Sequence, residues 1–321
     1  MRPWCGPRRI EAPGPAARCV TVKTMSDLIW SERPSLRRPV LIAAFGGWND
    51  AGDAASAAVE FIGARFEPRE VARIDPDEFI DFTDVRPTVR LTEGQLREID
   101  WPATTISAVE VAGAESDLAI LQGAEPAMRW RRYCAAVVEA ARDLDARMVI
   151  TLGALLADVP HTRPVSISAT GSDRDLVDKL GLDHTNYEGP TGIVGVVQHA
   201  CAEAGLSSLS LWASVPHYVA AAPNPKVALA LLRAFEGATG IAVDGSELES
   251  AAEDYERQVS AAVASDPEVK AFVERLESAL DEESEDGSPP ANLPSADTIA
   301  RDFQSFLRQR GPEGGGAGRT G

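Results

Sequence analysis

The stretch VLIAAFGG, residues 40–47, decides the fold class of this 321-residue chain. Six apolar residues in succession end at a pair of glycines. A continuous apolar run of this length is typical of a strand whose two faces are both buried, as in a parallel sheet. Asp50 and Asp53 follow at once and can cap a helix, which the sequence then predicts over residues 54–66.

Strands and helices alternate in the sequence that follows this strand. Further helices are predicted over residues 130–144, 173–180, 192–204 and 225–237. Further strands are predicted at residues 71–74, 79–82, 88–91, 104–109, 117–121, 148–152, 165–169 and 209–213. This alternation indicates one α/β domain over residues 27–244, with a sheet that is mostly parallel in its second half.

The composition changes from residue 245 onward. Leu248, Ala252, Tyr255 and Val259 recur at helical spacing, and Asp266-Pro267 supplies the cap and the first residue of a second helix. We therefore predict an acidic helical hairpin over residues 245–280. The other predicted segments are a disordered N-terminus, 1–26, a linker, 281–294, a C-terminal amphipathic helix, 295–310, and a disordered tail, 311–321.

The charge of the chain narrows the classes of protein that fit it. The sequence has 31 Lys and Arg residues against 49 Asp and Glu residues, a formal net charge of −18. Residues 245–287 alone hold 14 acidic and 3 basic residues, as expected for a solvated helix face. This acidic balance excludes general binding to nucleic acids and adhesion to anionic membranes. No segment has the roughly 18 apolar residues of a membrane-spanning helix, so we expect a cytoplasmic protein.

Five loops that carry glycine or histidine each follow a predicted strand. They are residues 46–52, 157–163, 170–173, 187–192 and 215–218. Ligands of open α/β sheets bind where such loops meet at the carboxyl ends of strands, and helices that begin there offer free N–H groups to an anion. The candidate pocket residues are Gly46, Gly47, Trp48, Asn49, Asp50, Gly52, Asp158, His161, Thr162, Arg163, Thr170, Gly171, Glu188, Gly189, Thr191, Gly192 and His217.

The chemistry of this pocket stays open at the level of sequence. Residues 46–52 form neither a dinucleotide-binding fingerprint nor a phosphate-binding P-loop. His161 and His217 each follow Val-Pro, and each can be a base, a metal ligand or a hydrogen-bonded structural residue. No third ligand stands at a metal-binding spacing, so neither a metal nor a cofactor is predicted. Ser168 and Ser214 lack the flanking glycines of a hydrolase nucleophile, and no catalytic residue is assigned.

Four motifs carry a family resemblance. They are Gly-Trp-Asn-Asp-Ala-Gly at 47–52, Gly-Ala-Leu-Leu-Ala-Asp-Val-Pro-His-Thr-Arg-Pro at 153–164, Tyr-Glu-Gly-Pro-Thr-Gly at 187–192 and Val-Pro-His-Tyr at 215–218. Together they resemble the actinobacterial branch of the proteasome assembly chaperone 2 family. The resemblance implies a three-layer α/β/α sandwich with a mixed, mostly parallel sheet, similar to nucleoside phosphorylases, and a C-terminal helical extension. It also implies a homo-oligomer, with relatives that assist assembly of the proteasome α-ring.

Two functions remain open. The first, implied by the resemblance, is a non-catalytic oligomeric chaperone that acts in protein-complex assembly, with proteasome subunits or another protein as its partner. The chain ends Gly-Ala-Gly-Arg-Thr-Gly, without the hydrophobic-Tyr-x motif that several such chaperones insert into α-ring pockets. The alternative is a small-molecule binding protein or enzyme that holds a nucleoside, phosphate or carboxylate in the candidate pocket.

Overall fold

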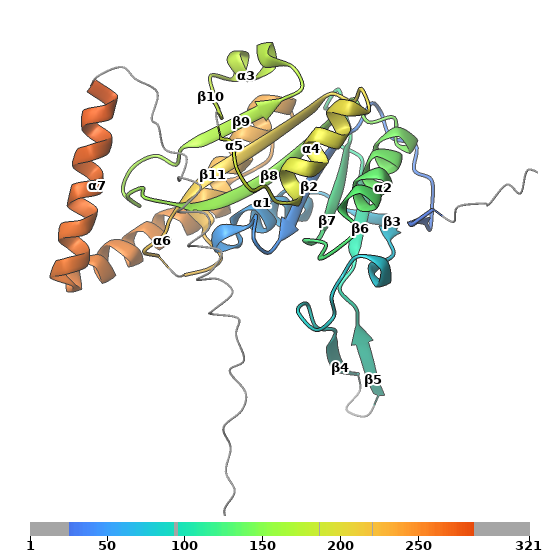
Figure 1. Ribbon diagram of the computed structural model, residues 1–321, viewed down its shortest axis with the longest axis horizontal. Coiled ribbons are helices and arrows are strands. Elements are labelled where there is room, and N and C mark those ends of the chain that lie inside the picture. The colour runs from blue at the N-terminus through green and yellow to red at the C-terminus, as the bar shows by residue number, and fades with distance from the viewer. Residues whose placement is uncertain (1–25, 93–95, 186, 220, 286–321) are drawn as a thin grey trace, which may run out of the picture.

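The computed structural model describes residues 26–92, 96–185, 187–219 and 221–285. Its centre is a nine-stranded sheet with the strand order β1-β3-β6-β7-β2-β8-β11-β9-β10 (Figure 1). The strands are β1 (Leu28–Trp30), β2 (Val40–Gly46), β3 (Arg69–Ile74), β6 (Thr104–Val109), β7 (Leu118–Ala124), β8 (Met148–Ala157), β9 (Ile167–Gly171), β10 (Asp183–His184) and β11 (Ser208–Pro216). The helices around the sheet are α1 (Ala54–Ala64), α2 (Trp130–Asp143), α3 (Arg174–Leu180), α4 (Ile193–Glu203) and α5 (Pro225–Thr239).

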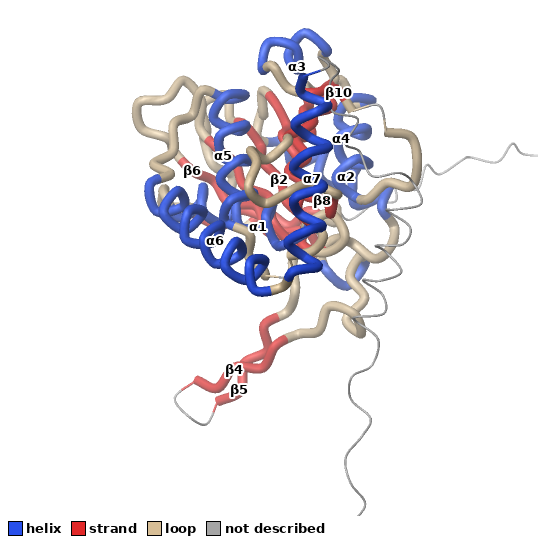
Figure 2. Tube along the Cα trace, turned by 90° about the vertical axis from the view of Figure 1, so that its left-hand side faces the viewer, coloured by secondary structure: helices blue, strands red, loops and turns tan. Residues whose placement is uncertain are grey.

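Strand β2 is the apolar stretch at residues 40–46, and it lies in the middle of the sheet. Val40 and Ile42 belong to the core cluster with α1 and α5, whereas Leu41 and Phe45 belong to the cluster with α2 and α4. All four side chains are fully buried, because a helix layer covers each face of the sheet. Figure 2 shows α1 and α5 on one side of the strands and α2 and α4 on the other. The predicted three-layer α/β/α architecture is therefore confirmed.

The central strands β7, β2, β8 and β11 are parallel to one another. The carboxyl ends of β2, β8 and β11 therefore lie at one edge of the sheet, together with the loops 46–52, 157–163 and 215–218 that follow them. Strand β9 runs antiparallel to β11, so the loop 170–173 after it lies at the opposite edge. The prediction that this loop joins the other four at one edge of the sheet is therefore wrong, because β9 is antiparallel to β11.

Two local predictions are corrected by the structure. Residues 79–82 are not a strand, because Phe79 follows a short 3-10 turn and packs edge-on against Tyr133, with ring centroids 5.3 Å apart. Strand β8 runs through Gly153 instead of ending before it. A Cβ at Gly153 would lie 2.7 Å from the Trp212 ring on β11, so the glycine leaves room for the indole and does not make a turn.

Strands β4 (Thr88–Thr92) and β5 (Leu96–Asp100) form a separate two-stranded antiparallel sheet, here called the arm. The arm projects away from the body of the protein (Figure 1). At its base Trp101 packs edge-on against Phe82, with ring centroids 5.0 Å apart. The sequence predicts β4 but not β5, whose residues LREID combine weak strand formers with charges.

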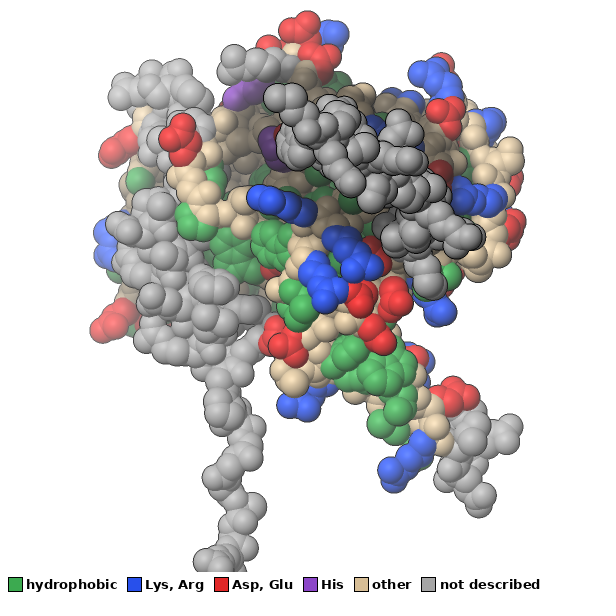
Figure 3. All heavy atoms as spheres, turned by 45° about the vertical axis from the view of Figure 1, so that its right-hand side comes forward, with side chains coloured by type: hydrophobic (Ala, Val, Ile, Leu, Met, Phe, Trp, Pro, Cys, Tyr) green, Lys and Arg blue, Asp and Glu red, His purple; other side chains and the backbone are tan. Residues whose placement is uncertain are grey.

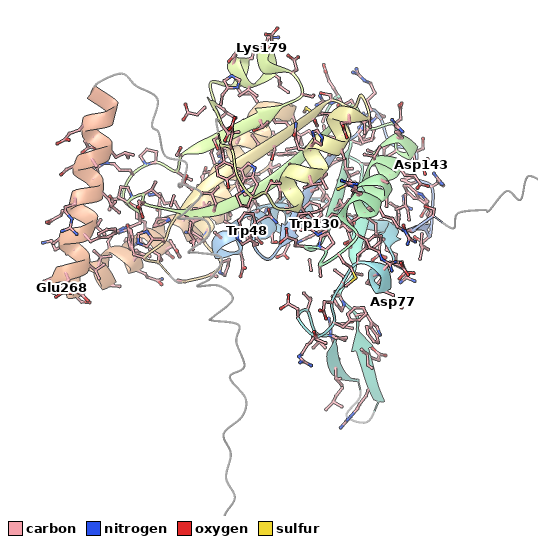
Figure 4. All side chains as sticks on the ribbon, in the orientation of Figure 1. Trp48, Asp77, Trp130, Asp143, Lys179 and Glu268 are labelled. Carbon is pink, nitrogen blue, oxygen red and sulfur yellow. The ribbon has the colours of Figure 1, made fainter. Side chains whose placement is uncertain are left out.

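Helices α6 (Ser246–Ser265) and α7 (Pro267–Glu285) lie beside the α/β body (Figure 1). Helix α6 packs on α5, and its Leu248 joins the core cluster of that face. Figure 4 labels Glu268 in the first turn of α7. Helix α7 includes residues 281–285, which the sequence analysis assigns to the linker. The rest of the linker, the predicted helix 295–310, the tail and residues 1–25 lie outside the described residues.

We predict that Ile42→Ala lowers the free energy of unfolding by about 2–5 kcal/mol, because it opens a cavity in a strand that is buried on both faces. Ile29→Ala, at a position of β1 that is 43% exposed, should change the same quantity by less than about 0.5 kcal/mol. Urea denaturation followed by circular dichroism measures both values. Equal losses in the two variants would contradict the central role of β2.

Candidate functional site

A cavity of about 600 Å³ lies over β8, β9 and β11, next to α4. Side chains of β9 and β11 form its floor, α4 and the turn before it form one wall, and the loop after β2 borders it. Trp48, in this loop, is labelled in Figure 4 beside the first turn of α1. A cavity of this size is typical of a site for a small organic molecule.

The floor of the cavity carries polar side chains because polar and apolar residues alternate along both strands that form it. On β11, Leu211 belongs to the core on the α1 and α5 side, while Ser210 and Trp212 line the cavity. On β9, Ser168 is paired with Trp212, and Thr170 is paired with Ser210. Directly paired residues of antiparallel strands place their side chains on the same face. These four side chains therefore form one continuous patch.

Asp50 borders the cavity and is only 4% exposed. Its Oδ1 accepts hydrogen bonds from the backbone N–H groups of Ala55, at 2.7 Å, and Ser56, at 3.2 Å, so Asp50 caps α1 as the sequence predicts. Its Oδ2 has no hydrogen-bond partner among the described residues. Burial raises the pKa of the Asp50 carboxyl, because the charged form loses hydration.

One carboxylate joins the loop after β2 to the start of α4. Oε1 of Glu125 accepts a hydrogen bond from Nδ2 of Asn49, at 2.6 Å, and another from the backbone N–H of Ile193, at 2.9 Å. A Cβ at Gly192 would lie 2.0 Å from Oδ1 of Asn49, so the helix can start this close only with a glycine. Glu125 therefore supplies the negative charge that the N-terminus of α4 favours.

His217 borders the cavity from the loop after β11. Its Nδ1 lies 2.9 Å from Oδ1 of Asp158. Its ring also contacts Tyr218 and Phe272 edge-on, with centroids 5.9 and 5.5 Å away. Because Phe272 belongs to α7, this histidine both borders the cavity and contacts the C-terminal helices.

His161 lies away from the cavity and connects the C-terminal helices to the body. It is 5% exposed, with Nδ1 2.8 Å from the hydroxyl of Tyr218 and Nε2 3.0 Å from Oγ of Ser260 on α6. Burial, followed by the charge of Lys226, lowers the pKa of the imidazole. Lys226 also donates a hydrogen bond to the carbonyl oxygen of His161. Of the three roles that the sequence leaves open for His161, these contacts favour that of a hydrogen-bonded structural residue.

The two residues after His161 contact α7. The Thr162 hydroxyl donates a hydrogen bond to Glu277, and Nη2 of Arg163 lies 2.6 Å from Oδ2 of Asp281. The hydrogen bond from Arg163 lowers the pKa of the Asp281 carboxyl. The loop 157–163 is therefore a docking surface for the helical extension.

The structure brings together part of the predicted pocket. The predicted residues that line the cavity are Gly47, Trp48, Asp50, Gly52, Thr170, Thr191, Gly192 and His217. The predicted residues that do not line it are Gly46, Asn49, Asp158, His161, Thr162, Arg163, Gly171, Glu188 and Gly189. A binding role for the first group stays a prediction.

Sequence reasoning did not assign Ser168, Ser210, Trp212 or Glu125 to this site. A sequence signal existed for the first three, because small polar residues alternate with apolar ones along β9 and β11. This alternation marks one face of the sheet as not covered by apolar packing. Glu125 had none. It follows β7 directly, and only the tertiary arrangement places its carboxylate between Asn49 and α4.

Other kinds of site find little support in the part of the chain that the structure describes. There, no three His, Cys, Asp or Glu side chains lie close enough to hold a metal ion, and no helix has both the length and the apolar character to cross a membrane. Cys134 and Cys201 are buried, and burial raises their pKa to about 12 and about 11. Buried thiols of this kind are inert.

Most of the sequence that forms this fold matches a known family. A model of the PAC2 family matches residues 44–263, well over half of the sequence. The chain belongs to the PAC2 family. The resemblance that the sequence motifs indicated is thereby confirmed, and the matched range includes all four motifs.

Several solved structures share the fold of this chain. One from Streptomyces avermitilis is 45% identical, with a TM-score of 0.69, over 73% of this chain and 99% of that one. A proteasome-assembly chaperone homologue from Mycobacterium tuberculosis is 42% identical, with a TM-score of 0.68, over the same shares. An archaeal proteasome activator from Pyrococcus furiosus shares the fold at 17% identity and a TM-score of 0.58, over 73% of this chain and 97% of that one. No protein with a curated function matches the chain.

We predict that Glu125→Ala lowers the free energy of unfolding by about 1–3 kcal/mol, because it leaves the buried amide of Asn49 and the N–H of Ile193 without their acceptor. Glu60→Ala is the matched control, since the Glu60 carboxylate accepts an exposed hydrogen bond from Gln122. Chemical denaturation compares the two variants. A loss no larger than that of the control would show that the Glu125 bridge does not stabilise the site.

We predict that acidification destabilises the protein through His161. A histidine in the unfolded chain has a pKa of about 6.5, whereas burial and Lys226 lower the pKa of His161 in the folded protein. The carboxylates of Glu256 and Glu277 raise this pKa by smaller amounts. The folded state therefore binds fewer protons, so this contribution to stability is complete above about pH 6.5 and declines as the pH falls through that value.

Melting temperatures measured between about pH 8 and pH 5 test this dependence. His161→Asn should flatten the decline, because the side chain no longer titrates. His199→Asn, at an exposed position of α4, should leave the decline as it is in the wild type. The mechanism is wrong if His161→Asn retains the full decline.

Proposed function

We propose that this protein is a non-catalytic, oligomeric protein of the cytoplasm that acts in the assembly of a protein complex, with proteasome subunits as its partners. Membership of the PAC2 family supports this role. So does the likeness to the mycobacterial protein that is named a proteasome-assembly chaperone homologue. The observation that carries the proposal is the apolar face of the arm.

The arm has two chemically different faces. Val89 is paired with Ile99, and Leu91 is paired with Arg97, so these side chains share one face. Val89, Leu91 and Ile99 are 56%, 66% and 53% exposed. The opposite face holds the pair of Arg90 and Glu98. Alternation of this kind is typical of a strand pair with one face packed against another surface.

An arm of two strands needs such a surface. A lone hairpin is at best marginally stable in water, and its outer edges present unpaired backbone N–H and C=O groups. Figure 3 shows apolar side chains gathered on the arm where it points away from the body. Exposed apolar surface on a projecting element is typical of a protein–protein contact.

We infer that the occupant of the apolar face is the arm of a second copy. Around a twofold axis, the same patch on both copies meets itself. The whole chain has a net charge of −18, but Arg90 and Arg97 balance Glu98 and Asp100 on the described part of the arm. Copies that meet through their arms therefore avoid the repulsion between the acidic helices.

Adjacent substitutions on the two faces of the arm test this contact. Val89→Lys places a charge on the apolar face and should shift the protein to a monomer at micromolar concentration. Thr88→Lys adds the same residue on the opposite face, where it lies across from Asp100, and should leave the oligomer intact. Size-exclusion chromatography with light scattering measures the molar mass. A wild-type monomer, or an equal effect of both variants, would refute the contact between copies.

The role in assembly is tested separately with purified proteasome α-subunits from an actinobacterium. Native mass spectrometry should detect a defined complex of the protein with these subunits. A failure to form this complex, with the oligomer intact, would refute the proteasome partner and leave the contact between arms standing. The alternative function, a small-molecule binding protein or enzyme, is favoured by one observation, the cavity of about 600 Å³.

A further inference from the structure

The helix N-termini around the cavity are already occupied by carboxylates of this chain. Oδ1 of Asp50 accepts the N–H groups at the start of α1, and Oε1 of Glu125 accepts the first N–H of α4. Free N–H groups at a helix start are what binds a phosphate or carboxylate. Here the protein's own acids hold these positions.

The charges around the cavity oppose an anion as well. Asp50 and Asp53 line it, and His217 lies beside the carboxylate of Asp158. Among the described residues that line the cavity there is neither a lysine nor an arginine. In a partly buried site, acids without a basic side chain nearby attract cations and repel anions. The cavity therefore suits a ligand that is cationic or neutral.

Two buried polar atoms of the cavity lining have no hydrogen-bond partner among the described residues. Asp50 is 4% exposed, and its Oδ2 is unpartnered; Ser210 is 2% exposed, and its Oγ is unpartnered. Buried polar atoms are nearly always satisfied in folded proteins, and exceptions point to an external partner. A carboxylate oxygen at Asp50 can only accept, so the partner has to present a donor such as N–H.

The lining of the cavity includes aromatic side chains. Trp212 lies on the floor, and Tyr187 lies in the turn before α4. The absent side chain of Gly153 leaves space for the indole of Trp212. Aromatic rings of this kind bind the flat face of another ring.

From these observations we infer that the cavity is a binding site for a flat, nitrogen-containing small molecule, neutral or cationic, that donates an N–H hydrogen bond to Asp50 and packs against Trp212. The site is separate from the arm, so the inference does not rest on the proposed role in assembly. It narrows the ligands that the sequence leaves open, because a free phosphate or carboxylate does not fit the charges of the lining.

Two pairs of probes, each with a shared ring system and different charge, test the ligand class. Tryptamine is compared with indole-3-acetate, and adenosine is compared with adenosine 5′-monophosphate. Isothermal titration calorimetry on the full chain should show binding of at least one of tryptamine and adenosine. Its anionic counterpart should bind at least about tenfold more weakly, because it lacks compensation for its charge.

Variants assign the binding to this cavity. Asp50→Asn removes the charge but keeps an acceptor for the start of α1, and it should weaken binding of whichever of tryptamine and adenosine binds the wild type about tenfold or more. Asp254→Asn removes an exposed carboxylate of α6 that pairs with Arg257, and it should have no effect. Ser168→Leu fills the floor without touching Asp50, and it should abolish binding of whichever probe binds the wild type, while the melting temperature is retained.

Ser210→Ala supplies an independent readout on the protein itself. Removal of a buried hydroxyl that has no partner should raise the melting temperature of the free protein and weaken the bound probe. The inference is overturned if neither tryptamine nor adenosine binds at millimolar concentration. It is also overturned if the anionic probes bind as tightly, or if Ser168→Leu leaves binding unchanged.

Discussion

The burial of β2 on both faces is the constraint on which the rest of the structure depends. Its alternate side chains need two separate apolar covers, which α1 with α5 and α2 with α4 provide. At the end of β2 the chain leaves the sheet between these layers, and it brings the polar side chains of Asn49 and Asp50 into a buried position. Glu125 accepts a hydrogen bond from Nδ2 of Asn49, and the first turn of α1 donates to Oδ1 of Asp50. The helix starts around the cavity are therefore fixed by the same loop.

The elements that could be predicted from the sequence are those whose pattern is set by local burial. The apolar run of β2 and the periodic faces of α5 and α6 leave a clear signal, because each element buries a regularly spaced set of apolar side chains. The direction of β9 leaves none, since parallel and antiparallel pairing place the same side chains on the same faces. Residues 79–82 look like a strand because Phe79 is buried, although it is buried by a ring contact with Tyr133 and not by strand pairing.

The candidate site could likewise be predicted only where a local sequence pattern marks it. The sequence locates the loops at the strand ends, but it cannot separate two identical Val-Pro-His segments. His217 follows β11 at once and borders the cavity, whereas His161 lies four residues beyond the end of β8 and reaches the C-terminal helices. From the sequence, the glycine-bearing loops are also predicted to bind an anion. Whether the N–H groups of these loops are free to bind an anion depends on carboxylates far away in the sequence, such as Glu125. No local sequence pattern reveals such carboxylates.

The polar side chains on the floor of the cavity indicate that the cavity has a function besides stabilising the fold. A chain selected only for a stable scaffold would cover β9 and β11 with apolar side chains, since an unsatisfied buried hydroxyl such as that of Ser210 costs stability. Local departures of this kind from the best packing are expected at functional sites. The arm departs from it as well, with exposed Val89 and Leu91. Because the two departures lie on different elements, one can bind a small molecule while the other joins protein chains.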